Sequence, residues 1–239
     1  MPFFFRTLAA VAAALLAQNA QSQSVIYNNT SGYNGNLNFD NAEAGNEVVL
    51  AGSASSDYIT QFQVQFDLIN SGASPLAGAP TGNEEVEVNF YKNNGAQVSG
   101  YDSPGTLLWS SGFSSMSTIG LSTFSEGQTL TYNPDVVVPD DFTWTLVFEN
   151  VPDGESAGMG LFSEPAGPSV GGNYSDAWVY TAASGWQLYV ASPGNPSLQF
   201  GAVLEGVPEL GTVALGVLGA GAFLAWRRRT DFLGKNCIR

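Results

Sequence analysis

Histidine is absent from this chain of 239 residues, cysteine occurs once, and lysine and arginine together number seven. Without histidine the chain cannot build an imidazole general base, a Ser-His-Asp triad or a histidine metal site. A single cysteine cannot form a disulfide within the chain or a thiolate cluster for zinc. Charged residues make up 12% of the sequence, against about 25% in an average soluble domain. These shortages exclude the commonest catalytic and redox devices.

The few basic residues are unevenly placed along the chain. Arg6 lies near the N-terminus, five bases lie in 227–239, and Lys92 is the only base between them. Residues 23–206 therefore hold 19 acidic residues and one basic residue, which is a formal charge of −18. Because such a segment repels phosphate groups, we expect no binding to nucleic acid.

Residues 1–22 have the features of a secretory signal peptide. The positive charge of Arg6 precedes eleven mostly apolar residues at 7–17, which are rich in alanine and leucine. This run is too short to span a bilayer and suits the hydrophobic region of a signal peptide. The small residues Ala20 and Ser22 then suit cleavage by a signal peptidase. The sequence therefore predicts that the chain is exported.

The C-terminal end predicts a membrane anchor. Residues 210–226 form an uncharged run of 17 residues, and Arg227, Arg228 and Arg229 follow at once. A helix of this length reaches roughly 25 Å, which is the short end of what crosses a bilayer. Arginines favour the cytoplasmic side, and Trp226 stands where an interfacial aromatic belongs. We therefore predict a transmembrane helix that leaves the acidic segment outside the membrane.

The features at this end follow a recognisable order. The tripeptide Val207, Pro208 and Glu209 precedes the apolar run, and the arginine cluster follows it. This order, over 207–229, resembles the PEP-CTERM sorting signal of exported bacterial proteins. The resemblance implies a membrane-embedded, exosortase-like processing enzyme as a partner and delivery to the cell surface or to an extracellular polysaccharide matrix. Leu210 stands where the family usually has proline, and 230–239 extend past the arginines as a cytoplasmic tail without an assigned role.

Between the ends, at 23–206, the hydrophobic residues recur with a period of two. Apolar and polar residues alternate over 61–68, 85–90, 142–148 and 198–204. This pattern is typical of half-buried antiparallel strands. Without an amphipathic helix or a sequence repeat, about ten such strands predict one all-β domain, an antiparallel β-sandwich of the jelly-roll kind. The segments 93–95 (Asn-Asn-Gly) and 102–105 (Asp-Ser-Pro-Gly) predict tight turns between strands.

Acidic residues are the only catalytic equipment in this domain. Glycoside hydrolases use two carboxyl groups roughly 5–10 Å apart. Glu85 and Glu87 share one face of a predicted strand, and Glu149 can lie opposite them. However, 19 acidic residues on a sandwich produce such pairs by chance. We therefore expect no enzyme and no catalytic residue, and we keep a glycoside hydrolase as the second alternative.

Acidic residues also suggest a calcium site, since calcium takes oxygen ligands from the loops of exported domains. Asp135, Asp140 and Asp141 flank one predicted strand and are the candidate ligands. No EF-hand loop pattern is present, so a solvated acidic surface explains these residues better. Calcium is therefore the one cofactor that the sequence leaves open.

Aromatic residues suggest a surface that binds sugars. Most aromatic side chains of a sandwich belong to its core, and Trp144 is expected there because it is in phase with its apolar neighbours. Trp178 and Trp186, which lie close to glycines, are the candidates for a glycan platform. The leading expectation is an exported structural or adhesive β-sandwich, and the first alternative is a carbohydrate-binding module of the polysaccharide matrix.

Overall fold

The computed structural model describes residues 23–52, 55–70, 84–115, 122–124, 127–151, 155–162, 167–190 and 198–208. The predicted signal peptide (1–22), the predicted helix (210–226), Glu209, the three arginines and the tail (230–239) lie outside the described residues. The described residues include no helix that could serve as a membrane span.

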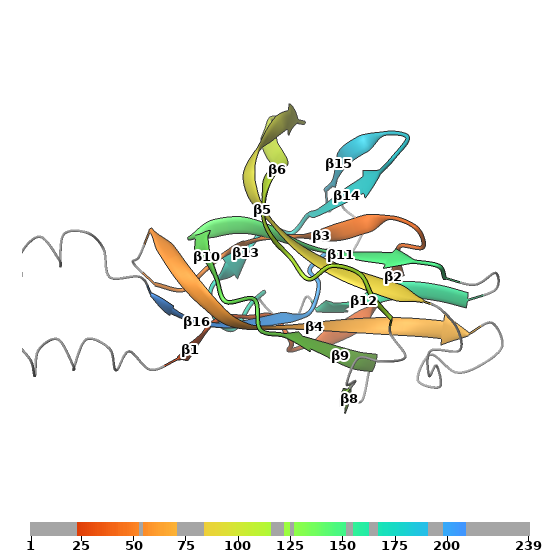
Figure 1. Cartoon of the computed structure of the whole chain (residues 1–239), viewed down its shortest axis with the longest axis horizontal. Helices are drawn as coiled ribbons and strands as arrows, with labels where there is room; N and C mark the ends of the chain where they lie inside the picture. Colours follow the sequence, from red (N-terminus) through yellow and green to blue (C-terminus); the bar gives the residue numbers. More distant parts are fainter. Residues whose placement is uncertain are drawn as a thin grey trace, which may run out of the picture.

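The described chain is all-β and folds into two antiparallel sheets (Figure 1). In the first sheet, β16 and β12 pair with successive parts of the long strand β4, β1 pairs with β16, and β2 pairs with β12. The strands of this sheet are β1 (Ser24–Asn28), β2 (Tyr33–Asn38), β4 (Ser56–Asn70), β8 (Ser122–Phe124), β9 (Gly127–Tyr132), β10 (Val136–Pro139), β12 (Glu155–Phe162) and β16 (Ala202–Pro208).

The second sheet has the order β15-β14-β3-β11-β5-β6, with β13 beside β3 and β7 beside β5. Its strands are β3 (Glu43–Val49), β5 (Glu85–Val98), β6 (Tyr101–Ser110), β7 (Ser114–Ser115), β11 (Asp141–Glu149), β13 (Gly172–Asn173), β14 (Ala177–Thr181) and β15 (Gly185–Tyr189). The predicted all-β class, antiparallel pairing and β-sandwich-like layering are thus confirmed.

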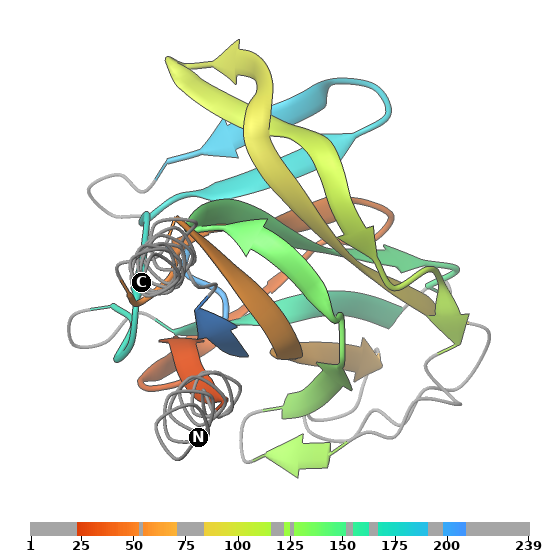
Figure 2. The same cartoon turned by 60° about the vertical axis from the view of Figure 1, so that its left-hand side comes forward.

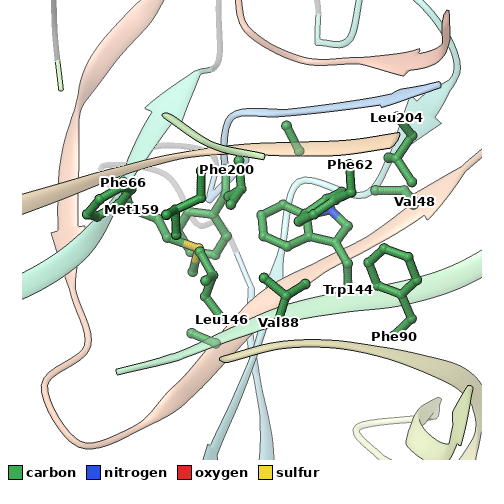
Figure 3. Close-up of a cluster of buried hydrophobic side chains, with 14 of the residues drawn as sticks. Val48, Phe62, Phe66, Val88, Phe90, Trp144, Leu146, Met159, Phe200 and Leu204 are labelled. Carbon is green, nitrogen blue, oxygen red and sulfur yellow. The ribbon is translucent and has the colours of Figure 1, made fainter. Parts of the chain in front are cut away.

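The two sheets pack against each other through the alternating apolar residues that the sequence pattern predicted to face inward. Phe62 of β4 packs against Phe90 of β5 and Trp144 of β11, with ring centroids 5.2 and 5.3 Å apart. Trp144 is fully buried at the centre of this layer, as predicted (Figure 3). Since successive side chains of a strand point to opposite faces, the intervening polar residues of β5 and β11 lie on the outer face of the second sheet.

The turn in the β5–β6 hairpin lies elsewhere than the sequence predicts. Segments 93–95 and 102–105 were expected to be turns, yet they lie within β5 and β6. The chain reverses at Ser99 and Gly100 instead, which have φ angles of 56° and 91°. Two consecutive positive φ angles suit a type I′ turn, whose twist matches that of paired strands.

The glycines of those two segments serve a close approach between strands. A Cβ atom on Gly95 would lie 2.7 Å from the carbonyl oxygen of Pro104. The side chain of Asn94 also accepts a hydrogen bond from the backbone N–H of Thr106. Glycine and asparagine are therefore needed here by a bulged strand pair, which produces the same local composition as a turn.

Two hairpins of the second sheet project away from the first sheet on the same side of the molecule. Figures 1 and 2 both show β5–β6 and β14–β15 rising together beyond β3 and β11. Tyr91 of β5 and Trp186 of β15 are in contact, with ring centroids 5.8 Å apart. Because these hairpins lie on opposite sides of β3 and β11 in the sheet order, their contact makes the outer face of the sheet concave.

Candidate functional site

The concave face carries a row of residues that runs across four strands. Tyr180 of β14 pairs in register with Glu43 of β3, Glu43 pairs with Val147 of β11, and Val147 pairs with Glu87 of β5. Neighbouring strands lie about 4.8 Å apart, so the backbones at Glu43 and Glu87 are about 9–10 Å apart. An aromatic ring and two carboxylates therefore lie in one row on the same surface, with Val147 between the carboxylates.

Glu43 is fixed by side chains from two other strands, β5 and β11. Its Oε1 atom accepts hydrogen bonds from Thr145 Oγ1 at 2.6 Å and from Asn89 Nδ2 at 3.2 Å. Burial and the nearby charge of Glu43 raise the pKa of Tyr91 well above its usual range. The tyrosine therefore keeps its proton and can donate a hydrogen bond to this carboxylate. This network gives Glu43 a defined orientation.

Aromatic rings form one wall of the site. Trp186 contacts Tyr180 with ring centroids 5.2 Å apart and Tyr91 with centroids 5.8 Å apart. Tyr180 is 39% exposed, and Phe113 at the other side of the site is 43% exposed. Because Trp186 joins the two tyrosines, it holds one ring from each projecting hairpin in a fixed relation.

These groups enclose an open groove of about 490 Å³. Ligand pockets in proteins commonly measure about 300–1,000 Å³ and combine apolar walls with a few polar groups. The groove has three carboxylates, three amides and three aromatic rings but no basic side chain. The residues that line it are Asn41, Ala42, Glu43, Glu87, Asn89, Tyr91, Phe113, Val147, Glu149, Asn150, Tyr180, Thr181 and Ala182.

The two tryptophans proposed as a glycan platform differ in their placement. Trp178 is 1% exposed and so presents no ring face to solvent. Trp186 is partly exposed and supports the two tyrosines, although it does not itself line the groove. Among the aromatic residues of the two projecting hairpins, Tyr91 and Tyr180 are therefore the ones that line the groove.

The acidic residues considered for hydrolysis meet as the strand pattern suggested. Glu85 is directly opposite Glu149 across β5 and β11, and Glu87 is two residue pairs further along the ladder, on the same face. Glu87 and Glu149 line the groove, whereas Glu85 accepts a hydrogen bond from Asn150. Diagonal neighbours of this kind lie about 7–8 Å apart.

A second group of acidic residues lies on the same face, with Glu47 and Asp141 at its centre. Burial, followed by the charge of Asp141, raises the pKa of Glu47 to about 8. Burial likewise raises the pKa of Asp141, although Asn93 donates a 2.6 Å hydrogen bond to its Oδ1 atom. The negative charge of Asp176 adds to the effect on Glu47. Glu47 is therefore the residue that holds a proton near neutral pH.

We expect this proton to make the stability of the domain depend on pH. The unfolded chain loses the Glu47 proton near pH 4.5, but the folded chain keeps it to about pH 8. The contribution of protonated Glu47 to the free energy of unfolding is therefore complete below the unfolded pKa. It is lost as the pH rises through about 8. Glu47→Gln should remove this loss and raise the melting temperature at about pH 9 by roughly 2 °C or more.

Thermal unfolding followed by circular dichroism at about pH 5 and about pH 9 measures this effect. Glu205→Gln removes the same charge from the first sheet and serves as the matched control, because general charge repulsion changes in both variants. If the melting temperatures of the two variants depended on pH in the same way, Glu47 would not be the source of the pH dependence.

The three candidate calcium ligands do not converge. Asp135 is exposed, with a φ angle of 49°, and the four-residue strand β10 separates it from Asp140. Asp140 Oδ1 is buried and makes no hydrogen bond within the described part of the chain, and Asp141 is paired with Glu47. No group of three or more acidic or cysteine side chains in this part is arranged to hold a metal ion.

A second hollow of about 560 Å³ lies beside the edge strand β2 and β15. It is mainly apolar and has no charged lining residue, and Tyr189 on its rim is 49% exposed. This hollow has an exposed aromatic ring but no carboxylate. A substitution of Tyr189 can therefore serve as a control for substitutions of the groove tyrosines.

Glu43, Asn89 and Tyr91 of the groove were not predicted from the sequence. The polar alternation of 85 and 87 continues through 89 and 91, so the signal for Asn89 and Tyr91 was present in the strand pattern. No local signal places Glu43 or Tyr180 beside them, because their strands come from other parts of the chain. Comparison with protein-family models, curated proteins and solved structures gives no match to this chain.

Proposed function

We propose that this chain is an exported protein of the cell surface or extracellular matrix, with a structural or adhesive role that it exerts by binding glycans in the groove. The observation that carries the proposal is the combination of Tyr91 and Tyr180 with carboxylate and amide groups on one concave face. Aromatic rings pack on the apolar faces of sugars, and fixed oxygen and amide groups bind sugar hydroxyls.

Binding to soluble glycan oligomers, measured by isothermal titration calorimetry, tests the proposal. We expect Tyr180→Ala to weaken binding about tenfold, which corresponds to about 1.4 kcal/mol. Tyr189→Ala removes a ring of similar exposure beside the second hollow and should leave the affinity unchanged. Equal affinities for both variants would place the binding surface elsewhere.

The sorting part of the proposal rests on the C-terminal pattern and the acidic, base-poor domain that precedes it. Val207 and Pro208 are paired with Tyr58 and Asp57 in β16, so a test that removes them also damages the sandwich. The suitable truncation therefore ends the chain at Pro208.

We expect the full-length chain in the envelope or matrix fraction, with loss of that retention in the truncated chain. Cell fractionation and immunoblotting measure the two distributions. A full-length chain that is freely soluble in the cytoplasm would contradict both the export and the sorting by a PEP-CTERM-like signal.

The jelly-roll description of the sandwich also belongs to this proposal. Support comes from the long strands β3, β4 and β5, which alternate between the two sheets, as do β11 and β12. Such crossing between sheets is typical of Greek-key and jelly-roll chains.

A glycoside hydrolase is the second candidate function. Glu87 and Glu149 both line the groove and are diagonal neighbours about 7–8 Å apart at the backbone. From that spacing, two glutamate side chains can place their carboxyl groups at the roughly 6.5–9.5 Å that inverting enzymes use. Release of reducing ends from bound glycans would favour this function, provided that Glu87→Gln abolishes the release while binding persists. If the protein binds glycans but does not cleave them, the hydrolase function is excluded and the adhesive role remains.

A further inference from the structure

We propose that the groove selects glycans that carry free amino groups, such as de-N-acetylated amino-sugar polymers, over acidic polysaccharides. This inference rests on the proposed function and concerns the chemical class of the ligand. It follows from the charges of the groove, from the way in which its carboxylates are held, and from the aromatic wall beside them.

The first step concerns the charges. Glu43, Glu87 and Glu149 all line the groove, and no basic residue does. Lys92 is the only base between 23 and 208, and strand alternation places it on the opposite face from Tyr91. An anionic sugar would therefore enter a groove that has no positive side chain to pair with it. An ammonium group would instead meet three carboxylates of opposite charge.

The second step concerns the orientation of the carboxylates. Glu43 is held through Oε1 by Thr145 and Asn89, and Glu87 Oε1 accepts a hydrogen bond from Ser110 Oγ. Charge-assisted hydrogen bonds favour acceptors that are already fixed, since less conformational entropy is lost on binding. About 9–10 Å separates the backbones of Glu43 and Glu87, which lets them contact different sugar rings of one oligomer.

The third step distinguishes an amino sugar from a basic peptide. Tyr180 presents a partly exposed ring in the same row as the two carboxylates, and Trp186 packs against it. A sugar ring with an amino substituent can stack on the flat ring of Tyr180 and bind the carboxylates through its ammonium group. A lysine side chain satisfies the carboxylates but offers no flat apolar face to the tyrosine.

Calorimetry of the full domain with five hexameric probes tests the inference: glucosamine, N-acetylglucosamine, neutral glucose and uronate oligomers, and a hexalysine peptide. We expect the glucosamine oligomer to bind about tenfold more tightly than the two neutral oligomers. Its affinity should fall as salt rises from about 0.05 to 0.5 M. The uronate oligomer should bind most weakly.

The variant Glu87→Gln should remove most of the preference for the glucosamine oligomer over the two neutral oligomers, because it removes one of the groove carboxylates. Glu205→Gln, which makes the same change on the first sheet, is the matched control. Circular dichroism verifies that both variants fold.

The other outcomes separate the two claims. Equal affinity for amino and neutral sugars, or preference for the uronate, would overturn the amino-sugar class and leave the glycan-binding function in place. Binding of hexalysine as tight as that of the glucosamine oligomer would make the groove a general site for polycations and would also overturn the inference. Failure of every glycan probe to bind would overturn both this inference and the proposed function.

Discussion

Replacement of Trp144 by alanine should lower the free energy of unfolding by about 3–5 kcal/mol. The ring is fully buried and packs against Phe62 of the first sheet, with Phe200 a further contact at a centroid distance of 6.4 Å. Its removal leaves a cavity between two sheets that cannot close without moving whole strands. Urea unfolding followed by circular dichroism measures the change.

The variant Trp144→Phe separates packing from polarity in this prediction. The indole Nε1 is buried and has no hydrogen-bond partner within the described residues, so its loss breaks no such bond. Phenylalanine keeps much of the apolar volume, and we expect a smaller loss than for alanine. A loss below about 1 kcal/mol for Trp144→Ala would contradict the placement of this ring at the core centre.

Replacement of Asn46 by alanine should cost about 3 kcal/mol or more, although no charge is lost and little apolar surface changes. The fully buried amide donates hydrogen bonds to the carbonyl oxygens of Asp176 and Leu198, both at 2.7 Å. It also accepts a hydrogen bond from the backbone N–H of Phe200 at 2.6 Å. Three backbone groups from two other segments would be left unpaired inside the protein.

The same urea unfolding experiment measures this prediction, with Asn133→Ala as its matched control. Asn133 is an exposed asparagine outside the strands, so its replacement should change stability by no more than about 0.5 kcal/mol. Similar small losses in both variants would show that the three hydrogen bonds to Asn46 contribute little. Asn46→Asp keeps the acceptor but removes the donor and should be destabilising as well.

The strands were predictable where one face is buried and the other is not. The alternation over 61–68, 85–90 and 142–148 identified parts of β4, β5 and β11, because their inward residues are apolar and their outward residues polar. The alternation over 198–204 began too early: β16 starts at Ala202. Leu198 and Phe200 belong to an irregular segment that Asn46 holds in place, which no local pattern encodes.

The candidate site was predictable only in part, for a related physical reason. Glu87 and Glu149 stand on strands with clear alternation, and their common face follows from period two alone. Glu43 and Tyr180 join them through register pairs between residues far apart in the chain. The burial of Trp178 likewise depends on what packs over the outer face, so its neighbouring glycines gave no indication of it.

The pairing of β1 with β16 determines how the domain carries mechanical load. Ser24 lies opposite Gly206, so both ends of the sandwich emerge at the same place, and β16 is held between β1 and β4. Tension between the two ends would peel β1 away one residue pair at a time. A pull on the end of β16 against a ligand held in the groove instead strains its bonds to β1 and β4 together. An adhesive tethered through its C-terminal strand would thus be loaded in its stronger direction.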